Sequence, residues 1–254
     1  LEATSSVKPY GTRYWDHAGN EVSDNLRGDD SRIIMDRAIP FIENAVAAEV
    51  PFFAAIWFHA PHLPVVAGPD HVKPYRQYDV YARNYFGCIT ALDEQLGRLR
   101  SKLSQLNAAQ NTMLWFCSDN GPEGSKGKAP GSSGDLRGRK RALYEGGVRV
   151  PAFLVWPAKV QPGTSTNTLA ATSDYLPTIL DVLQVSYPSK RPLDGMSLLS
   201  TIHDPSTESQ RSLGFQSRDQ IAWHRDQHKL ISHDRGKTWE LYDLQSDRGE
   251  KNNN

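Results

Sequence analysis

The chain has 254 residues, of which 38% are hydrophobic and 23% charged, and its 29 lysines and arginines balance its 29 aspartates and glutamates. This length suffices for one sizeable domain, alone or with a small appendage. Zero net charge excludes a long-range electrostatic attraction of the whole chain to nucleic acid or to an anionic membrane. The longest apolar run, residues 51–58, is far shorter than the roughly 20 residues of a membrane span. We therefore expect neither partner.

The N-terminal half predicts a helix, a buried strand and a long helix, after a surface segment over residues 1–30. Ser31 is suited to cap a helix with apolar positions at 3.6 spacing, which Pro40 is expected to kink. Residues 52–58 are apolar on both faces, as in a central strand covered by helices. Apolar residues then recur every three or four positions over 81–106, which predicts a helix of about seven turns.

Residues 112–117 predict a second buried strand, followed by a glycine-rich, basic loop that reaches Gly147. A loop of about thirty residues inside a compact domain is usually functional or disordered. A strand over 150–156 precedes a helix that Ser173 is suited to cap. Its inward-facing residues are expected to be Leu176, Ile179, Leu180 and Leu183.

This alternation of strands and helices predicts an α/β domain over residues 1–204. Short alternating segments at 220–223, 228–232 and 239–244 predict a small antiparallel sheet, which makes residues 205–254 a separate subdomain. Cys88 and Cys117 fall in a helix pattern and a strand pattern, so both are expected to fill core space. The first residues show no initiating Met and no targeting segment, so we expect a fragment.

Asp119 and Asn120 follow directly after a buried strand, where an open α/β sheet places its ligand sites. A carboxylate and an amide offer hard oxygen ligands suited to Ca²⁺ or Mg²⁺, and Gly121 lets the backbone turn sharply behind them. Taken alone, the pair is more simply interpreted as an Asx turn that ends the strand.

His59 and His62 follow the other predicted strand, in a loop that Pro61 and Pro64 stiffen. An imidazole held in this way is suited to contact an anionic ligand. A zinc site is not supported, because no cysteine or further histidine cluster accompanies the pair. A structural role for either histidine is the alternative.

Residues 136–151 form a cationic cluster that contains Lys140 and Glu145. Such a cluster is consistent with a solvated face, a nucleic-acid patch or a localisation signal. No aromatic residue interleaves among the basic residues at 137–141 for base stacking, and the net charge is zero, so a compact anion fits better, with Lys140 as a point charge on a tetrahedral oxyanion. Glu145 would offset part of the local positive charge.

In this order and spacing, the sequence resembles the type I sulfatases of the alkaline-phosphatase-like superfamily from about residue 30 to its end. The resemblance implies an α/β sandwich with a mostly parallel central sheet, helices on both faces and a small C-terminal antiparallel sheet. The matching segments are 51–53, 61–64, 91–93, 118–121, 136–140, 144–151, 174–178, 194–198, 229–231 and 240–244.

The resemblance implies that Asp119 and Asn120 ligate a single Ca²⁺ and that Lys140 contacts the sulfate of the substrate. It places His62 against the sulfate or the leaving oxygen and gives His59 no firm counterpart. A dication, an ammonium and an imidazole around one sulfuryl group would stabilise the charge that sulfate-ester hydrolysis develops. The implied substrate is a sulfated small molecule or a sulfated glycan.

The sequence departs from the family at the nucleophile, a formylglycine made from Cys or Ser in a Cys-x-Pro-x-Arg element. Neither Cys88 nor Cys117 begins such an element. The N-terminal Asp-Asp metal pair also lacks a counterpart, since Asp29-Asp30 precedes a helix instead of following a strand, and Arg248 replaces the usual Pro of the last motif. We expect the second half of a catalytic domain, inactive alone, with formylglycine in a missing N-terminal part.

Two alternatives remain open. A phosphoesterase of the same superfamily would hold two metals with Asp-His-Gly, where this chain has Asn120 in the middle position. A degenerate sulfatase-like protein would bind sulfated glycans through Lys140 without cleaving them. An upstream Cys-x-Pro-x-Arg element would favour the sulfatase. The family resemblance implies secretion, periplasmic export or lysosomal residence, and the oligomeric state is open.

Overall fold

The computed structural model describes residues 2–4, 13–207 and 211–253. The chain divides into two compact units, one made of residues 1–110 and 125–132 and the other of residues 111–124 and 133–254. The predicted boundary between residues 204 and 205 falls inside the second unit and stays a prediction. No helix in the described ranges is long and apolar enough to cross a membrane.

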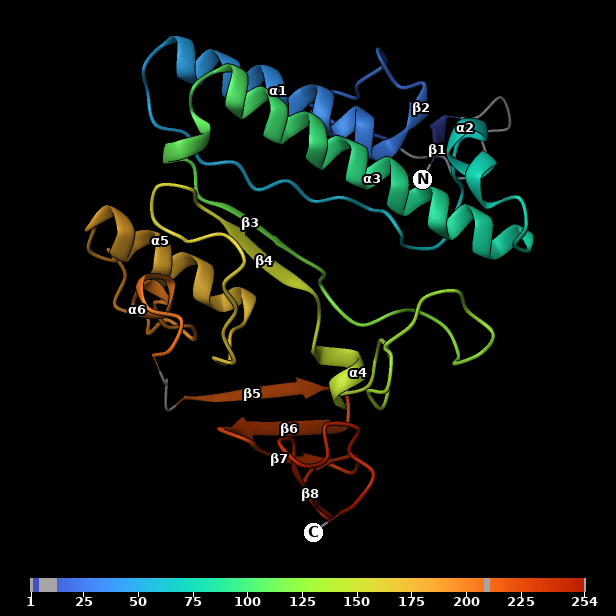
Figure 1. Cartoon of the computed structure of the whole chain (residues 1–254), viewed down its shortest axis with the longest axis vertical. Helices are drawn as coiled ribbons and strands as arrows, with labels where there is room; N and C mark the ends of the chain where they lie inside the picture. The colour runs from blue at the N-terminus through green and yellow to red at the C-terminus, as the bar shows by residue number, and fades with distance from the viewer. Residues whose placement is uncertain (1, 5–12, 208–210, 254) are drawn as a thin grey trace. The chain divides into compact units, whose positions relative to one another are not determined.

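Two long helices dominate the first unit, α1 (Asp30–Ala47) and α3 (Val80–Gln105), which lie side by side (Figure 1). The short helix α2 (Pro69–Val72) packs on α3, and β1 (Glu2–Thr4) pairs antiparallel with β2 (Gly28–Asp29). The two long helices bury apolar side chains whose removal from water stabilises the unit. These are Ile33, Met35, Ile39, Ile42 and Ala45 on α1, and Cys88, Ala91, Leu99 and Leu103 on α3.

The predicted helix over 81–106 is confirmed as α3, and the first predicted helix is confirmed with a different cap. Asp29 is the N-cap of α1, because its carboxylate accepts a hydrogen bond of 2.8 Å from the backbone N–H of Ser31. Ser31 is a buried residue of the first turn instead. Pro40 lies inside α1 on the exposed side, and the kink stays a prediction.

The predicted strand over 52–58 is wrong, since residues 51–59 form no strand. A strand is stabilised by hydrogen bonds to a neighbouring strand, and among the described pairings none involves this segment. Phe53 is 70% exposed and Trp57 85% exposed. The apolar composition therefore does not produce a buried strand in this unit.

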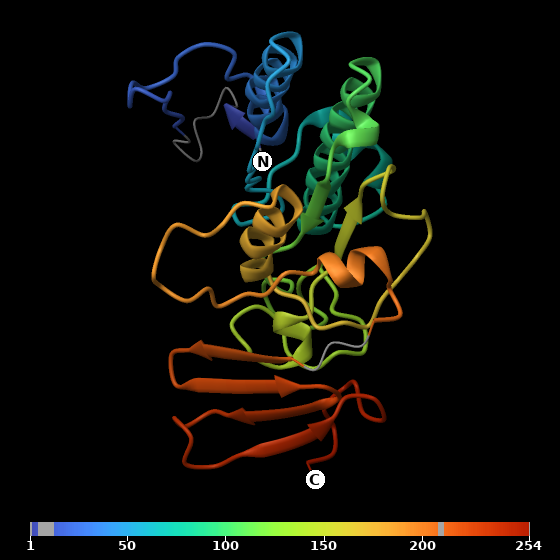
Figure 2. The same ribbon diagram turned by 90° about the vertical axis from the view of Figure 1, so that its left-hand side faces the viewer.

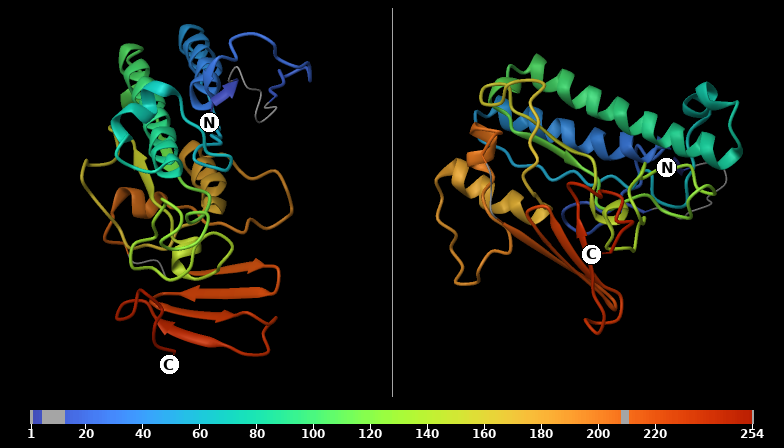
Figure 3. Two further views of the ribbon diagram at one scale, coloured as in Figure 1. Left: turned by 90° about the vertical axis from the view of Figure 1, so that its right-hand side faces the viewer. Right: turned by 60° about the horizontal axis from the view of Figure 1, so that its bottom comes forward.

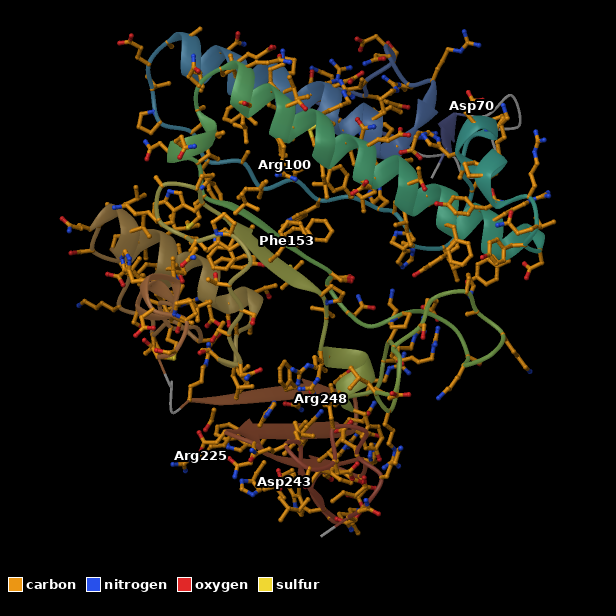
Figure 4. All side chains as sticks on the ribbon, viewed as in Figure 1. Asp70, Arg100, Phe153, Arg225, Asp243 and Arg248 are labelled. Atoms are coloured by element: carbon orange, nitrogen blue, oxygen red, sulfur yellow. The ribbon has the colours of Figure 1, made fainter. Side chains whose placement is uncertain are left out.

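The second unit begins with β3 (Leu114–Cys117), which pairs antiparallel with β4 (Ala152–Val155). On this pair the ring of Phe153, which Figure 4 labels, stacks on the ring of Phe116. The two ring centroids are 4.9 Å apart. Both strands lie within the predicted ranges 112–117 and 150–156, and the α/β class is confirmed. All strand pairs in the part that the structure describes are antiparallel, so the mostly parallel central sheet stays a prediction.

The helix predicted after Ser173 is present as α5 (Tyr175–Leu183), preceded by a 3-10 turn at Thr172–Asp174. The expectation of an inward leucine face is wrong for Leu176, which is 45% exposed, and Leu183, which is 62% exposed. The buried residue of the helix is Thr178, whose hydroxyl donates to the Asp174 carbonyl and accepts from the N–H of Leu198. Hydrogen bonds therefore fix the buried side of α5.

The small antiparallel sheet predicted for the C-terminal part is confirmed, and it has four strands in the order β5-β6-β7-β8 (Figures 2 and 3). Its strands are β5 (Ser212–Ser217), β6 (Gln220–Arg225), β7 (His228–Ser232) and β8 (Glu240–Asp243). The sequence did not predict β5. One face of the sheet packs on the end of the long loop, in a cluster of Leu143, Tyr144, Ala222, Ile231, Tyr242 and Leu244.

Candidate functional site

The turn at residues 118–121 leaves β3 with two exposed or half-buried oxygen-bearing side chains. The Ser118 hydroxyl donates to the backbone carbonyl of Asn120 over 2.9 Å, which closes the turn. The Asp119 side chain is exposed and that of Asn120 half-buried. Within residues 2–4, 13–207 and 211–253, neither side chain makes a hydrogen bond or an ion pair. Their oxygens are free to meet a cation.

Three glycines hold this turn against α4 (Glu145–Val148). The backbone N–H of Gly121 donates to the Gly147 carbonyl over 2.9 Å. A Cβ on Gly121 would lie 1.9 Å from the Gly146 carbonyl oxygen, and one on Gly147 would lie 2.0 Å from that of Ala142. Contacts this short exclude any side chain, so the backbone of the long loop packs directly on the turn. We call Gly121, Gly146 and Gly147 the glycine cradle.

Lys140 is fixed beside the turn through its backbone. Its N–H donates to the carbonyl of Pro122, the residue after Gly121, over 3.1 Å. One residue earlier, the Arg139 guanidinium donates to the Glu123 carbonyl over 2.9 Å. The structure therefore brings Asp119, Asn120 and Lys140 onto adjacent segments of one unit.

Glu123 is a member of this cluster that the sequence did not reveal. Its carboxylate lies 2.5 Å from the Arg141 guanidinium and 3.9 Å from the Lys140 ammonium. The hydrogen bond from Arg141, followed by that from the backbone N–H of Gly124, lowers the pKa of Glu123 to about 2. Glu123 is therefore anionic at neutral pH. It lies near Lys140, the residue that a bound oxyanion would also contact. Its position two residues after Gly121 is the only signal in the sequence.

A buried ionic cluster adjoins the glycine cradle, because it includes Glu145, the residue before Gly146. The Lys229 ammonium lies 2.9 Å from the Glu145 carboxylate and 3.0 Å from that of Glu250, and all three side chains are buried. The N–H of Glu145 also donates to Glu250 over 2.6 Å. Arg248, labelled in Figure 4, lies two residues before Glu250, so the departure from Pro at residue 248 leaves this contact in place.

The two carboxyl groups of the cluster have opposite pKa shifts. Burial raises the pKa of Glu250, and the neighbouring Lys229 only partly opposes that effect. Burial acts in the same direction on Glu145, but Lys229 and further cations outweigh it and lower the pKa of Glu145 overall. The same cation therefore outweighs burial at Glu145, next to the cradle, but not at Glu250.

The two predicted histidines belong to the first unit. His62 is exposed, and its Nδ1 lies 2.6 Å from the Leu63 carbonyl oxygen. His59 lies in the same loop, with its Nδ1 2.9 Å from a carboxylate oxygen of Asp30. Asp119, Asn120 and Lys140 are in the second unit, so the role expected for His62 stays a prediction.

The donor chemistry fits part of a calcium site. Ca²⁺ takes about six to eight oxygen ligands, and Asp119 and Asn120 provide a carboxylate and an amide oxygen without protein partners. In the ranges that the structure describes, no group of three or more His, Cys, Asp or Glu side chains is arranged to hold a metal ion. The pair can thus contribute to such a site but cannot complete it.

Comparison with known proteins identifies related sequences over residues 4–254. Residues 4–185 match the sulfatase family, and residues 138–254 match the C-terminal region of N-sulphoglucosamine sulphohydrolase. Arylsulfatase G of Rattus norvegicus is 30% identical over 188 residues, which cover 70% of this chain and 35% of that protein. N-acetylgalactosamine-6-sulfatase of Homo sapiens is 32% identical over 197 residues, which cover 75% of this chain and 37% of that protein.

Among solved structures, BT4656 in complex with its substrate D-glucosamine-2-N,6-O-disulfate superposes with a TM-score of 0.77 and 19% identity. The superposition covers 95% of this chain and 67% of BT4656. At this identity the likeness concerns the fold, and it agrees with the expected alkaline-phosphatase-like class. The chain spans little more than a third of the length of the two curated relatives above.

Proposed function

The chain belongs to the sulfatase family, and we propose that the full-length protein containing it hydrolyses a sulfate ester. This chain would supply Asp119 and Asn120 to a calcium ion and would supply Lys140 and His62 to the sulfate group. In this proposal the calcium ion and the Lys140 ammonium both balance the negative charge of the sulfuryl oxygens.

One observation carries the proposal. The backbone of Lys140 is hydrogen-bonded to Pro122, immediately after the turn that presents Asp119 and Asn120. Two hard oxygen donors and a primary ammonium therefore emerge from neighbouring backbone segments that the glycine cradle locks together. A carboxylate alone would repel a sulfate, but a carboxylate that holds a dication beside a lysine makes a site for one.

The cofactor part of the proposal concerns calcium and formylglycine. Bound Ca²⁺ would polarise the sulfuryl oxygens and neutralise charge on the leaving oxygen. Asp119 and Asn120 would be two of its ligands. The 254 residues contain no Cys-x-Pro-x-Arg element, so we propose that the nucleophile and the remaining calcium ligands come from outside this sequence.

Lys140, Glu123 and His62 have different proposed roles in sulfate binding. Lys140 moves its ammonium from Glu123, 3.9 Å away, to a sulfuryl oxygen, which it holds as a point charge. Glu123 keeps its hydrogen bond to Arg141 and so stays neutralised when the lysine turns away. We propose that His62 contacts the sulfate from the loop after residue 58.

The proposed substrate is a sulfated small molecule or a sulfated glycan. The support is the names of the relatives, an arylsulfatase and an N-acetylgalactosamine-6-sulfatase, and the sulfated glucosamine bound by BT4656. Nucleic acid is not a proposed partner.

The test is turnover of 4-nitrophenyl sulfate by the full-length protein, as wild type and as Lys140→Ala. Loss of one preorganised charge contact costs about 10²–10³-fold in turnover, and we expect that loss here. Lys159→Ala is the matched control, because Lys159 is an exposed lysine of the same unit and its loss should leave turnover unchanged. Wild-type turnover in Lys140→Ala would contradict the assignment of Lys140.

Two further measurements separate the alternatives. A preference for 4-nitrophenyl phosphate over the sulfate would favour a phosphoesterase. Retention on a heparin column that depends on Lys140, without turnover of any sulfate ester, would favour a non-catalytic binder. The isolated 254-residue chain is expected to turn over neither ester.

A further inference from the structure

Glu123 contacts two cations of the second unit in unequal ways. One of its carboxylate oxygens accepts hydrogen bonds from the Arg141 guanidinium over 2.5 Å and from the backbone N–H of Gly124 over 2.9 Å. The other oxygen lies 3.9 Å from the Lys140 ammonium, which is too long for a hydrogen bond. The carboxylate is thus bound to Arg141 and only adjacent to Lys140.

A tight turn brings the two cations to this carboxylate. The N–H of Ala142 donates to the Arg139 carbonyl over 2.9 Å, so Lys140 and Arg141 are the central residues of a four-residue turn. The backbone at Arg141 has a φ of 79°, a left-handed conformation for which such turns usually have glycine. The Gln220 amide donates to the Arg141 carbonyl over 2.8 Å and helps to hold this conformation. An arginine at a glycine position indicates that its side chain is used.

The segment that contains Glu123 is fixed to the same turn. The Arg139 guanidinium donates to the Glu123 carbonyl over 2.9 Å, and the N–H of Lys140 donates to the Pro122 carbonyl over 3.1 Å. The Glu123 side chain is 25% exposed and that of Lys140 22% exposed, so water and salt screen their charges less than at an open surface. The carboxylate therefore stays beside Lys140 when the ammonium turns to a bound oxyanion.

A purely structural role does not account for this arrangement. An ion pair with an exposed partner contributes little to stability, and the Arg141 side chain is 59% exposed. Arg235 and Asp219 form such a pair in the same unit, at 2.7 Å and with both side chains exposed. Among the residues that the structure describes, no second cation lies within ion-pair distance of Asp219. At Glu123 the second cation is the lysine assigned to the substrate.

The charge of a ligand decides how strongly Glu123 acts on it. The hydrogen bond from Arg141, followed by that from Gly124, lowers the pKa of Glu123 to about 2, so the carboxylate is ionised at neutral pH. A sulfate monoester carries one negative charge there. A phosphate monoester of the same shape has a second pKa near about 6 and carries two. Coulomb energy is proportional to the charge of each partner, so the carboxylate repels the phosphate ester about twice as strongly.

We propose that Glu123 makes the Lys140 site selective for singly charged sulfate esters over doubly charged phosphate esters; this rests on the proposed function. Arg141 holds the carboxylate in place, and the carboxylate cancels the Arg141 charge, so the ligand meets Lys140 with a neutral pair beside it. Without the Glu123 charge the ligand would meet two cations, which favours a dianion. Glu123 thus weakens the binding of both esters and weakens that of the phosphate more, which is specificity through a repulsive contact.

The test uses two inhibitors that differ in charge but have the same shape. Benzenesulfonate is a monoanion and phenylphosphonate a dianion at pH 8.5, and their inhibition constants are measured against 4-nitrophenyl sulfate with the full-length protein. Glu123→Gln keeps an oxygen acceptor for Arg141 and Gly124 but loses the charge. It should tighten phenylphosphonate relative to benzenesulfonate by about fivefold or more, because one unit charge at roughly 4 Å changes binding by that factor even in bulk water.

Arg141→Gln separates charge from structure, because it breaks the same contact and changes the charge in the opposite direction. It should weaken phenylphosphonate relative to benzenesulfonate, whereas loss of a merely structural contact would change both constants by equal factors in both variants. Asp135→Asn removes one negative charge from an exposed residue of the same loop and should leave the ratio of the two constants unchanged. All three variants should keep the wild-type Tm, which separates an altered charge from a loss of folding.

An unchanged ratio in Glu123→Gln, or a shift of its ratio toward benzenesulfonate, would overturn the inference and leave the proposed function intact. Wild-type full-length protein that cleaves no sulfate ester would instead overturn the proposed function, and this inference with it.

Discussion

The ammonium of Lys229 lies 2.9 Å from the carboxylate of Glu145, and both side chains are completely or almost completely buried. Lys229 belongs to β7 of the small sheet, and Glu145 is the first residue of α4. The next residue, Gly146, belongs to the glycine cradle and packs directly against Gly121. This ion pair thus joins the C-terminal sheet to α4, whose backbone packs on the turn that carries Asp119 and Asn120.

Lys229→Met should lower the free energy of unfolding by about 3–5 kcal/mol, because it leaves two buried carboxylates without their cation. Urea unfolding followed by circular dichroism measures the change. Arg235→Met is the control, since the pair of Arg235 with Asp219 has a similar distance, 2.7 Å, but is exposed and should contribute less than about 1 kcal/mol. Equal effects of the two substitutions would show that burial of the Lys229 pair does not matter.

The raised pKa of Glu250 predicts a particular dependence of stability on pH. An acid whose pKa is higher in the folded state loses stability as pH rises from its unfolded value, 4.5, through its folded value. Glu250→Gln cannot ionise, so it should escape this loss. The stability of Glu250→Gln relative to wild type should therefore increase as pH rises from 4.5 to 7.5.

Urea unfolding at three pH values in that window checks the Glu250 prediction. The exposed Glu49, changed to Gln, is the control and should show a difference from wild type that does not vary with pH. A relative stability of Glu250→Gln that falls as pH rises would mean that the buried carboxyl is stabilised by ionisation, opposite to the direction found here.

The sequence signals for the candidate site of the second unit are local, and the roles predicted for its residues stay predictions. The glycine cradle lies in two short motifs, residues 118–121 and 144–151. The backbone contacts between these motifs leave no room for a side chain at Gly121, Gly146 or Gly147. A resemblance that preserves the motifs therefore also preserves the packing of Asp119 and Lys140. Secondary structure with strong periodicity, such as α3, was predictable for the same reason.

Other contacts depend on distant residues and had no local signal. The motifs at 174–178 and 194–198 were recognised separately, but the structure joins them through Asp174, which accepts from the N–H of Met196 over 3.0 Å. Asp174 also receives two hydrogen bonds from Arg211, a residue in neither motif. The strand expected at 52–58 failed because apolar composition specifies burial without specifying a pairing partner.

Asp119→Ala tests the calcium assignment through stability instead of turnover. The Asp119 carboxylate is exposed and makes no hydrogen bond or ion pair with any residue that the structure describes, so without calcium the variant should melt like wild type. Calcium should raise the Tm of the wild-type full-length protein by mass action, and the rise should be much smaller in the variant because a hard ligand is lost. Asp135→Ala, an exposed aspartate of the same unit, should respond to calcium like wild type. A full response in Asp119→Ala would remove the ligand role.

Gly121→Ala tests whether the cradle positions the site. Its new Cβ would meet the Gly146 carbonyl oxygen at 1.9 Å, and backbone cannot move aside as a flexible side chain does. We expect a loss of about 1–3 kcal/mol or more in the free energy of unfolding and, in the protein that folds, a weaker response of Tm to calcium. Gly97→Ala is the matched control, because a Cβ there meets nothing within 4 Å and Gly97 lies inside α3, where alanine should stabilise by about 0.5–1 kcal/mol. If Gly121→Ala were as stable as wild type, the turn would have room to move, and the backbone contact between Gly121 and α4 could not be what holds Asp119 and Asn120 beside Lys140.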